Sequence, residues 1–220
     1  MNKENRINNK LPLAREGFPF IFIGIGTIVI FAALGWMTLT IIASIITLFV
    51  IYFFRDPERH PLEAKNAVFS PADGRILETR NVIGEDTPPG QSSIKVSIFM
   101  NVFNVHVNRI PIEGTIKAVS YHPGKFLSAD LDKASEQNEN NRITLKTDDS
   151  REIMVIQIAG LVARRIACWI QKGDTVKTGQ RFGLIRFGSR LEVFLPEGSK
   201  IAVQIGQKVK AGETVIGYLS

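Results

Sequence analysis

The pattern of apolar and polar residues divides the chain into two unequal parts. Residues 1–17 are polar, whereas no charged residue occurs from Phe18 to Phe54. An uncharged stretch of this length exceeds the roughly 20 residues that one membrane-spanning helix needs. Gly35 and Trp36, near its middle, place a flexible residue beside an aromatic that favours the membrane interface. The pattern predicts a membrane-embedded helical hairpin over residues 18–54.

Basic side chains flank this apolar stretch on both sides: Lys10, Arg15, Arg55, Arg59 and Lys65. Because positive flanks prefer the cytoplasm, two positive flanks favour a hairpin over a single crossing. Each half is at the short end of the spanning range, so a hairpin lying in one leaflet is an alternative. We therefore expect a protein of the cell membrane, with the part after the hairpin on the cytoplasmic side.

The remainder of the chain has the pattern of a β protein. A charged linker with prolines, residues 55–67, ends the helical pattern. From residue 68 to 220, short apolar segments alternate with turn-forming Gly, Pro, Asn and Asp, which is typical of strands. Between residues 94 and 109 the apolar alternation changes phase near Val102, which predicts a bulge or a break there.

A weak internal repeat refines the expected fold. Residues 173–179 are echoed by residues 206–212, and an apolar strand follows each copy. Repeated turn-strand units suggest two halves of a β-sandwich or barrel. The repeat resembles the half-motifs of biotinyl and lipoyl-like domains, so we predict a mainly β, barrel-sandwich domain. The tripeptide Asp132-Lys133-Ala134, which carries lipoate in lipoyl domains, leaves a non-enzymatic, membrane-anchored carrier as an alternative.

Charge and cysteine content narrow the partners. The net charge of +6 and the pI near 9.5 suit contact with anionic phosphate. No basic run interleaved with aromatics is present, so lipid headgroups are favoured and nucleic acid is not expected. The single cysteine, Cys168, excludes an intrachain disulfide and a cysteine-based metal cluster.

Three side chains of the β region form a candidate nucleophilic set. Ser189 follows Gly188, a residue that tolerates backbone angles closed to others, although Gly-Ser is also an ordinary turn pair. His106 shares a polar strand face with Asn104 and Asn108. Together with Asp73, His106 and Ser189 have the residue types in which His takes a hydroxyl proton and Asp orients the ring. A conventional serine hydrolase acting on lipids is one interpretation of this set.

The motifs around these residues resemble those of the phosphatidylserine decarboxylase proenzymes in their short prokaryotic form. The resemblance covers nearly all of residues 55–220. Members with a longer pattern carry His-x-x-His, and the earlier position in this chain is Phe103. The motifs that carry the resemblance are Phe54-Arg55-Asp56-Pro57, Ser70-Pro71-Ala72-Asp73-Gly74, Val102-Phe103-Asn104-Val105-His106-Val107-Asn108-Arg109, Gln157-Ile158-Ala159-Gly160 and Arg186-Phe187-Gly188-Ser189.

This resemblance implies a pyruvoyl-dependent carboxy-lyase of phospholipid biosynthesis. The zymogen would cut itself between Gly188 and Ser189 into a large chain, residues 1–188, and a small chain, residues 189–220, that stay together as a heterodimer. His106, oriented by Asp73, would deprotonate Ser189, which becomes the covalent pyruvoyl group. That group would form a Schiff base with phosphatidylserine and release CO2, giving phosphatidylethanolamine without a metal or an external cofactor. An archaetidylserine decarboxylase acting on ether lipids is the alternative substrate class.

Overall fold

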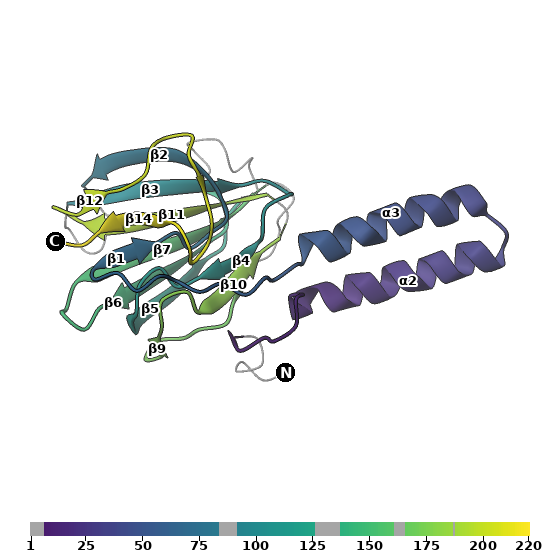
Figure 1. The fold of residues 1–220 in the computed structure, drawn as a ribbon, viewed down its shortest axis with the longest axis horizontal. Helices are drawn as coiled ribbons and strands as arrows, with labels where there is room; N and C mark the ends of the chain where they lie inside the picture. The colour runs from purple at the N-terminus through teal and green to yellow at the C-terminus, as the bar shows by residue number, and fades with distance from the viewer. Residues whose placement is uncertain (1–6, 84–91, 126–136, 161–165, 187) are drawn as a thin grey trace. The chain divides into compact units, whose positions relative to one another are not determined.

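A computed structural model describes residues 7–83, 92–125, 137–160, 166–186 and 188–220 (Figure 1). The chain forms two compact units, Met1–Glu58 and Arg59–Ser220. The tripeptide Asp132-Lys133-Ala134 lies outside the described residues.

The first unit is a pair of packed helices. After the short 3-10 helix η1 (Arg15–Gly17), α2 spans Phe18–Ala33 and α3 spans Met37–Phe53. Gly35 has a φ of +72° in the turn between the helices, a conformation that favours glycine. A Cβ at Gly24 would lie 2.4 Å from Thr47 Oγ1, so this glycine allows the helices to approach closely. The predicted pair of helices is present.

The two ends of this helix pair are bound to each other. The Asn9 amide donates to Asp56 Oδ2 at 3.1 Å, and the Ala14 N–H donates to the Phe54 carbonyl at 2.7 Å. Both flanking segments therefore leave the helix pair at the same end.

Residues Arg15–Ala33 form a helix long and apolar enough to cross a membrane, and Met37–Phe53 is a shorter apolar helix.

The second unit is mainly β. Its described strands form an eight-stranded sheet in the order β13-β2-β3-β11-β7-β6-β5-β9, and two three-stranded sheets, β1-β14-β12 and β4-β10-β8 (Figure 1). The strands are β1 (Ala67–Phe69), β2 (Gly74–Val82), β3 (Ser93–Met100), β4 (Val107–Arg109), β5 (Gly114–His122), β6 (Asn140–Lys146), β7 (Glu152–Ala159), β8 (Ile166–Cys168), β9 (Thr175–Val176), β10 (Arg181–Ile185), β11 (Ser189–Pro196), β12 (Lys200–Ile201), β13 (Lys208–Val209) and β14 (Val215–Tyr218).

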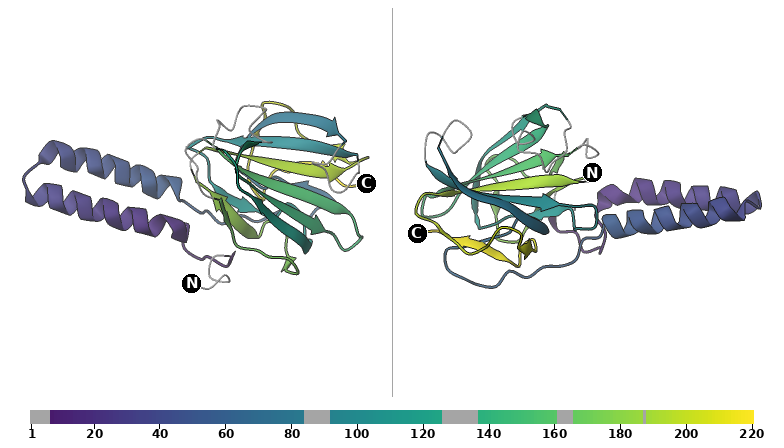
Figure 2. Two further views of the ribbon diagram at one scale, coloured as in Figure 1. Left: turned by 180° about the vertical axis from the view of Figure 1, so that it is seen from behind. Right: turned by 90° about the horizontal axis from the view of Figure 1, so that it is seen from above.

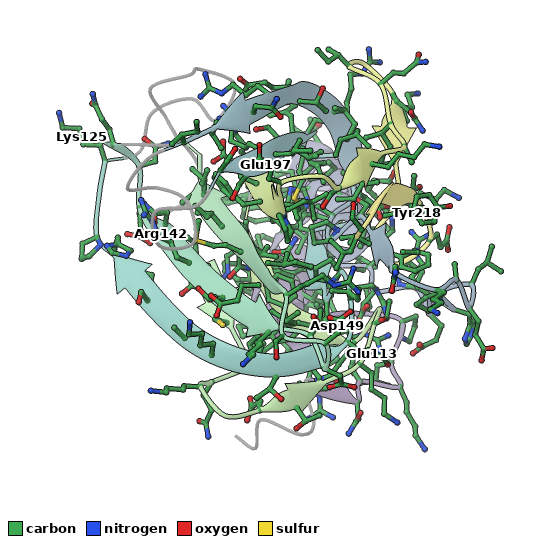
Figure 3. The ribbon with its side chains drawn as sticks, turned by 90° about the vertical axis from the view of Figure 1, so that its left-hand side faces the viewer. Glu113, Lys125, Arg142, Asp149, Glu197 and Tyr218 are labelled. Atoms are coloured by element: carbon green, nitrogen blue, oxygen red, sulfur yellow. The ribbon has the colours of Figure 1, made fainter. Side chains whose placement is uncertain are left out.

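The large sheet is strongly curled, as two further views show (Figure 2). Its central strand β11 pairs with β3 on one side and with β7 on the other. Every second residue of β11 is apolar and buried on the face toward the small sheets, where Leu195 approaches Gly217 of β14. Side chains fill the space inside the curl (Figure 3). Burial of β11 on both faces explains its nearly continuous buried pattern.

The internal repeat in the sequence corresponds to a repeat in the structure. Gly173 and Gly206 have φ values of +90° and +86°. Their N–H groups donate to the carbonyls of Ile116 and Ile76, both at 2.8 Å. The short strands that follow, β9 and β13, pair with β5 and β2 at opposite edges of the large sheet. Counted outward from the central β11–β7 pair, β3, β2 and β13 on one side correspond to β6, β5 and β9 on the other. Strands β11–β14 thus repeat the arrangement of β7–β10.

The predicted break near Val102 is also present. Strand β3 ends at Met100, and β4 begins at Val107 in a different sheet. In the intervening turn, the Asn101 N–H donates to Asn104 Oδ1 and the Phe103 N–H donates to Asn101 Oδ1, both at 2.9 Å. The change of phase in the sequence therefore marks the passage from one sheet to another.

Candidate active site

Gly188 and Ser189 lie where the chain passes from a small sheet into the large one. Strand β10 precedes them in the small sheet, and Ser189 is the first residue of β11, where it pairs with Met100 and Ala159. Residues 101–106 make the corresponding passage in the opposite direction, from the large sheet to the small one. Met100, just before them, pairs with Ser189 in the large sheet, and Val107, just after them, pairs with Leu184 in the small sheet. The register thus places His106 on the crossover beside the one that contains Gly188-Ser189.

The Gly188–Ser189 link combines an unusual backbone with a buried hydroxyl. Gly188 has a φ of +71°, and a Cβ built there would meet no atom within 4 Å. Ser189 is fully buried, and its Oγ donates to the thioether sulfur of Met100 at 3.4 Å. A thioether is a weak acceptor, so this contact restrains the hydroxyl only lightly. The serine is therefore shielded from water, and the backbone at Gly188 has room to change its conformation.

His106 is held in one tautomer by the backbone. The imidazole is fully buried, and its Nδ1 lies 2.9 Å from the carbonyl oxygen of Asn104. A carbonyl oxygen can only accept, so Nδ1 carries the proton in the neutral ring and Nε2 keeps its lone pair. This tautomer is the one in which Nε2 can act as a general base.

Asp73 joins three segments of the second unit. It accepts hydrogen bonds from the Ala211 N–H at 2.8 Å and from Arg59 at 3.2 Å. Arg59 also pairs with Glu213 at 2.6 Å, and this guanidinium lowers the pKa of the Glu213 carboxyl. The linker, the turn before β2 and the small C-terminal segment therefore meet at Asp73. That Asp73 also orients His106 stays a prediction.

Strand pairing brings the three sequence-predicted residues to the same end of the large sheet. Asp73 immediately precedes β2, in which Arg75 pairs with Phe99 near the end of β3. Ser189 pairs with the last residue of β3. The Arg109 N–H at the end of β4 donates to the Pro71 carbonyl at 2.9 Å, which fixes the Asp73 turn beside the strand that follows His106.

Three buried residues near this site were not identified as functional from the sequence. Met100 accepts the Ser189 hydroxyl, Asn108 donates to the same sulfur at 3.8 Å, and Gln157 donates to Asn108 Oδ1 at 2.8 Å. A signal was present, because Gln157 is a polar residue within the apolar segment of residues 153–158. A polar side chain that interrupts such a strand needs a buried partner.

The fold and the site define a mainly β protein with a candidate serine–histidine nucleophilic site at a crossover between sheets. The family model described as phosphatidylserine decarboxylase matches residues 46–217. The chain belongs to the phosphatidylserine decarboxylase family.

Three curated relatives extend this match over nearly the whole chain, and each of them is named phosphatidylserine decarboxylase proenzyme. The protein from Syntrophus aciditrophicus is 54% identical over 211 residues, which cover 93% of this chain and 96% of the relative. The protein from Desulfotalea psychrophila is 47% identical over 96% of this chain and 98% of its own length. The protein from Ralstonia nicotianae is 47% identical over 97% of this chain and 100% of its own length.

Proposed function

We propose that this protein is a self-cleaving phosphatidylserine decarboxylase whose processing site is the Gly188–Ser189 bond. The observation that carries the proposal is the buried Ser189 hydroxyl, which follows a glycine at φ +71° and begins the strand beside the His106 crossover. The names of the relatives, which include both the decarboxylase activity and a proenzyme, support the same function.

The cleavage we propose begins with an acyl shift from nitrogen to oxygen. His106 Nε2 takes the Ser189 proton, Oγ attacks the Gly188 carbonyl carbon, and the proton passes to the departing nitrogen as the C–N bond breaks. Removal of the Ser189 Cα proton then expels the Gly188 carboxylate from Cβ and leaves dehydroalanine. Addition of one water and loss of one ammonia convert this residue into a pyruvoyl group.

The residues around Ser189 fit such a group. The open space at Gly188 leaves room for the new chain ends to separate, and the burial of residue 189 keeps bulk water from its carbonyl. The pyruvoyl ketone would supply an electrophile for the serine amine of the lipid and an electron sink for loss of CO2. In this proposal Asp73 fixes the surrounding segments and helps to orient His106, and the product is phosphatidylethanolamine.

The strand pairing supports a heterodimer of the two fragments. The small fragment supplies β11, which lies between β3 and β7 of the large fragment. It also supplies β13, which pairs with β2, and β14, which pairs with β1. Arg151 donates to the terminal Ser220 carbonyl at 2.8 Å. Separation of the fragments would therefore require the β unit to unfold.

We further propose that residues 18–54 embed the protein in the cell membrane as a hairpin, with the β unit on the cytoplasmic side. Many large apolar side chains of α2 and α3 are exposed, including Phe22 and Met37, each 71% exposed. Thr27 and Thr47 donate their hydroxyl protons to carbonyls of their own helices, which satisfies them without water. An anchor of this kind suits a double-chained lipid substrate that stays in the bilayer.

The domain limits we propose are a polar N-terminus (1–17), a membrane hairpin (18–54), a linker (55–67) and a decarboxylase domain (68–220). The repeated edge strands β9 and β13 support assigning the last of these to the barrel-sandwich type.

Intact-mass spectrometry tests the function directly. We expect two co-purifying fragments, residues 1–188 and 189–220, the smaller beginning with a pyruvoyl group. The sum of the two fragment masses should equal the mass of the precursor plus one water and minus one ammonia. Simple hydrolysis would instead add one water and leave an N-terminal serine. The purified pair should release CO2 from phosphatidylserine. A single uncut chain, or a cut pair without decarboxylase activity, would contradict the proposal.

Replacement of Gly188 by alanine should slow the cleavage. Because φ is +71°, alanine should cost about 1–2 kcal/mol of folding stability, and its methyl group would restrict the attacked carbonyl. Gly206→Ala is the matched control, since Gly206 has a φ of +86° and equally open surroundings. Both variants should lose similar stability in chemical unfolding, but only Gly188→Ala should cleave more slowly. Equal cleavage rates would show that the Gly188 conformation is not used.

A further inference from the structure

Three buried amide side chains form one hydrogen-bonded series that leads to the reaction site. Asn141 Nδ2 donates to Gln157 Oε1 at 2.9 Å, and Gln157 Nε2 donates to Asn108 Oδ1 at 2.8 Å. Asn108 Nδ2 then donates to Met100 Sδ at 3.8 Å, the same sulfur that accepts the Ser189 hydroxyl. The five residues of this series, which ends at Ser189, are each at most 2% exposed. We call Asn141, Gln157 and Asn108 the amide network.

The amide network has a fixed direction. Because Asn141 occupies the oxygen of Gln157, the Gln157 NH2 group points toward Asn108. Because Gln157 in turn occupies the oxygen of Asn108, the Asn108 NH2 group points toward Met100. Each amide thus determines which end the next one presents. The last group, an N–H donor, is directed at the sulfur beside Ser189.

The contact at the end of this series is weak for a buried polar group. Thioether sulfur is a poor acceptor, yet Met100 takes donors from both Asn108 and Ser189. Buried polar groups are normally hydrogen-bonded, and an exception in a native structure calls for an explanation, of which a catalytic role is one. Such a contact favours one orientation of the hydroxyl, yet the hydroxyl can give up its proton without first breaking a strong hydrogen bond.

The second sheet is shaped to admit the amide network. Gly183 of β10 pairs with Asn108, and a Cβ at Gly183 would lie 2.9 Å from Gln157 Nε2 and 2.3 Å from the Ala167 carbonyl oxygen. A larger residue at this position would push into the bond between Gln157 and Asn108. The close approach of the two sheets therefore depends on glycine there.

We propose that Asn141, Gln157 and Asn108 are positioning residues, which act through Met100 to hold the Ser189 hydroxyl ready for self-cleavage. This inference rests on the proposed function, because it assigns the network to the cleavage at Ser189. The amides act from three strands, β6, β7 and β4, so that the serine is aligned by the folded core and not by its own turn.

Gln157→Glu is the sharpest test, because it keeps the shape of the side chain. A buried carboxyl has a raised pKa. In its neutral form it can still donate to Asn108 Oδ1 and accept from Asn141. Once ionised it can only accept, so the Asn108 NH2 group would turn toward it and away from Met100. We expect the ratio of the Gln157→Glu cleavage rate to the wild-type rate to be near one at low pH and to fall about tenfold once the carboxyl ionises.

The measurement is a time course of cleavage of the full chain, made by cell-free synthesis with detergent micelles and followed on gels at several pH values. Thermal unfolding of Gln157→Glu in a Ser189→Ala background should show a folded protein throughout this pH range. A profile identical to that of the wild type would overturn the inference.

Two neighbouring residues of β6 provide a matched pair in case Gln157→Glu does not fold. Asn141 belongs to the network, whereas Asn140, also buried, donates to the Asn138 carbonyl at 3.0 Å. Asn141→Leu should slow cleavage about tenfold and Asn140→Leu should not. Equal rates in the two variants would overturn the inference. If the wild-type chain itself stays uncut, the proposed function fails, which is a different result from a wild type that cleaves alongside insensitive variants.

Discussion

Ser189→Ala should leave the chain at full length and abolish the release of CO2 from phosphatidylserine. The substitution removes the only atom of residue 189 that can attack the Gly188 carbonyl, and no pyruvoyl group can then form. Since the hydroxyl donates only to a thioether in the described contacts, its loss should cost little stability. We expect cleavage and activity to fall by about a thousandfold or more, measured by intact mass and by trapped CO2.

Ser199→Ala supplies the control for this experiment. Ser199 is also buried in the small fragment, and its Oγ donates to the Pro196 carbonyl at 2.7 Å. That variant should cleave and decarboxylate like the wild type. Ser189→Cys should still cut, because a thiol can make the same shift from nitrogen. Two fragments from Ser189→Ala would show that another residue starts the cleavage.

The regular features of the fold were predictable because they depend on local pattern. The uncharged stretch from Phe18 to Phe54 predicted the helix pair, since an apolar run of this length is typical of apolar helices. The change of phase near Val102 gave the end of β3. The apolar strand expected after each copy of the repeat is present as β10 and β14, and the first glycine of each copy, Gly173 or Gly206, has a positive φ value.

The partners of the site residues were not predictable, because they come from distant parts of the sequence. Asp73 accepts from Ala211, 138 positions away, and Gln157 donates to Asn108, 49 positions away. The sequence identified Asp73 and His106 by residue type, but it did not show that the Nδ1 of His106 faces the nearby Asn104 carbonyl. Sequence motifs identify the reactive groups, whereas the order of the strands determines which residues contact them.

The position of Gly188-Ser189 follows from the internal repeat. Strands β7–β10 and β11–β14 are equivalent units joined at this link, so a cut there separates one whole repeat from the rest of the chain. Because β11 pairs with β3 and β7, and the proposed cut would leave these strand pairings in place, we expect the fold not to depend on the Gly188–Ser189 bond. A junction between repeats is thus a place where we expect a cut in the backbone to leave the core intact.

His106→Asn should distinguish the roles of the two imidazole nitrogens. The asparagine NH2 group can take the place of Nδ1 and donate to the Asn104 carbonyl, so the crossover should keep its structure. No atom would replace Nε2, which we assign as the base. Self-cleavage should therefore slow by about a hundredfold or more, the usual contribution of a positioned general base. A time course of the full chain from cell-free synthesis measures the rate.

His122→Asn is the matched control, because His122 is exposed on β5 and should not affect the rate. Thermal unfolding of each variant in a Ser189→Ala background separates loss of the base from loss of the fold. If His106→Asn is folded but cleaves at the wild-type rate, the proton of Ser189 must leave by another route. A slow but folded variant would instead place the base at Nε2, because the Nδ1 contact is the one that asparagine retains.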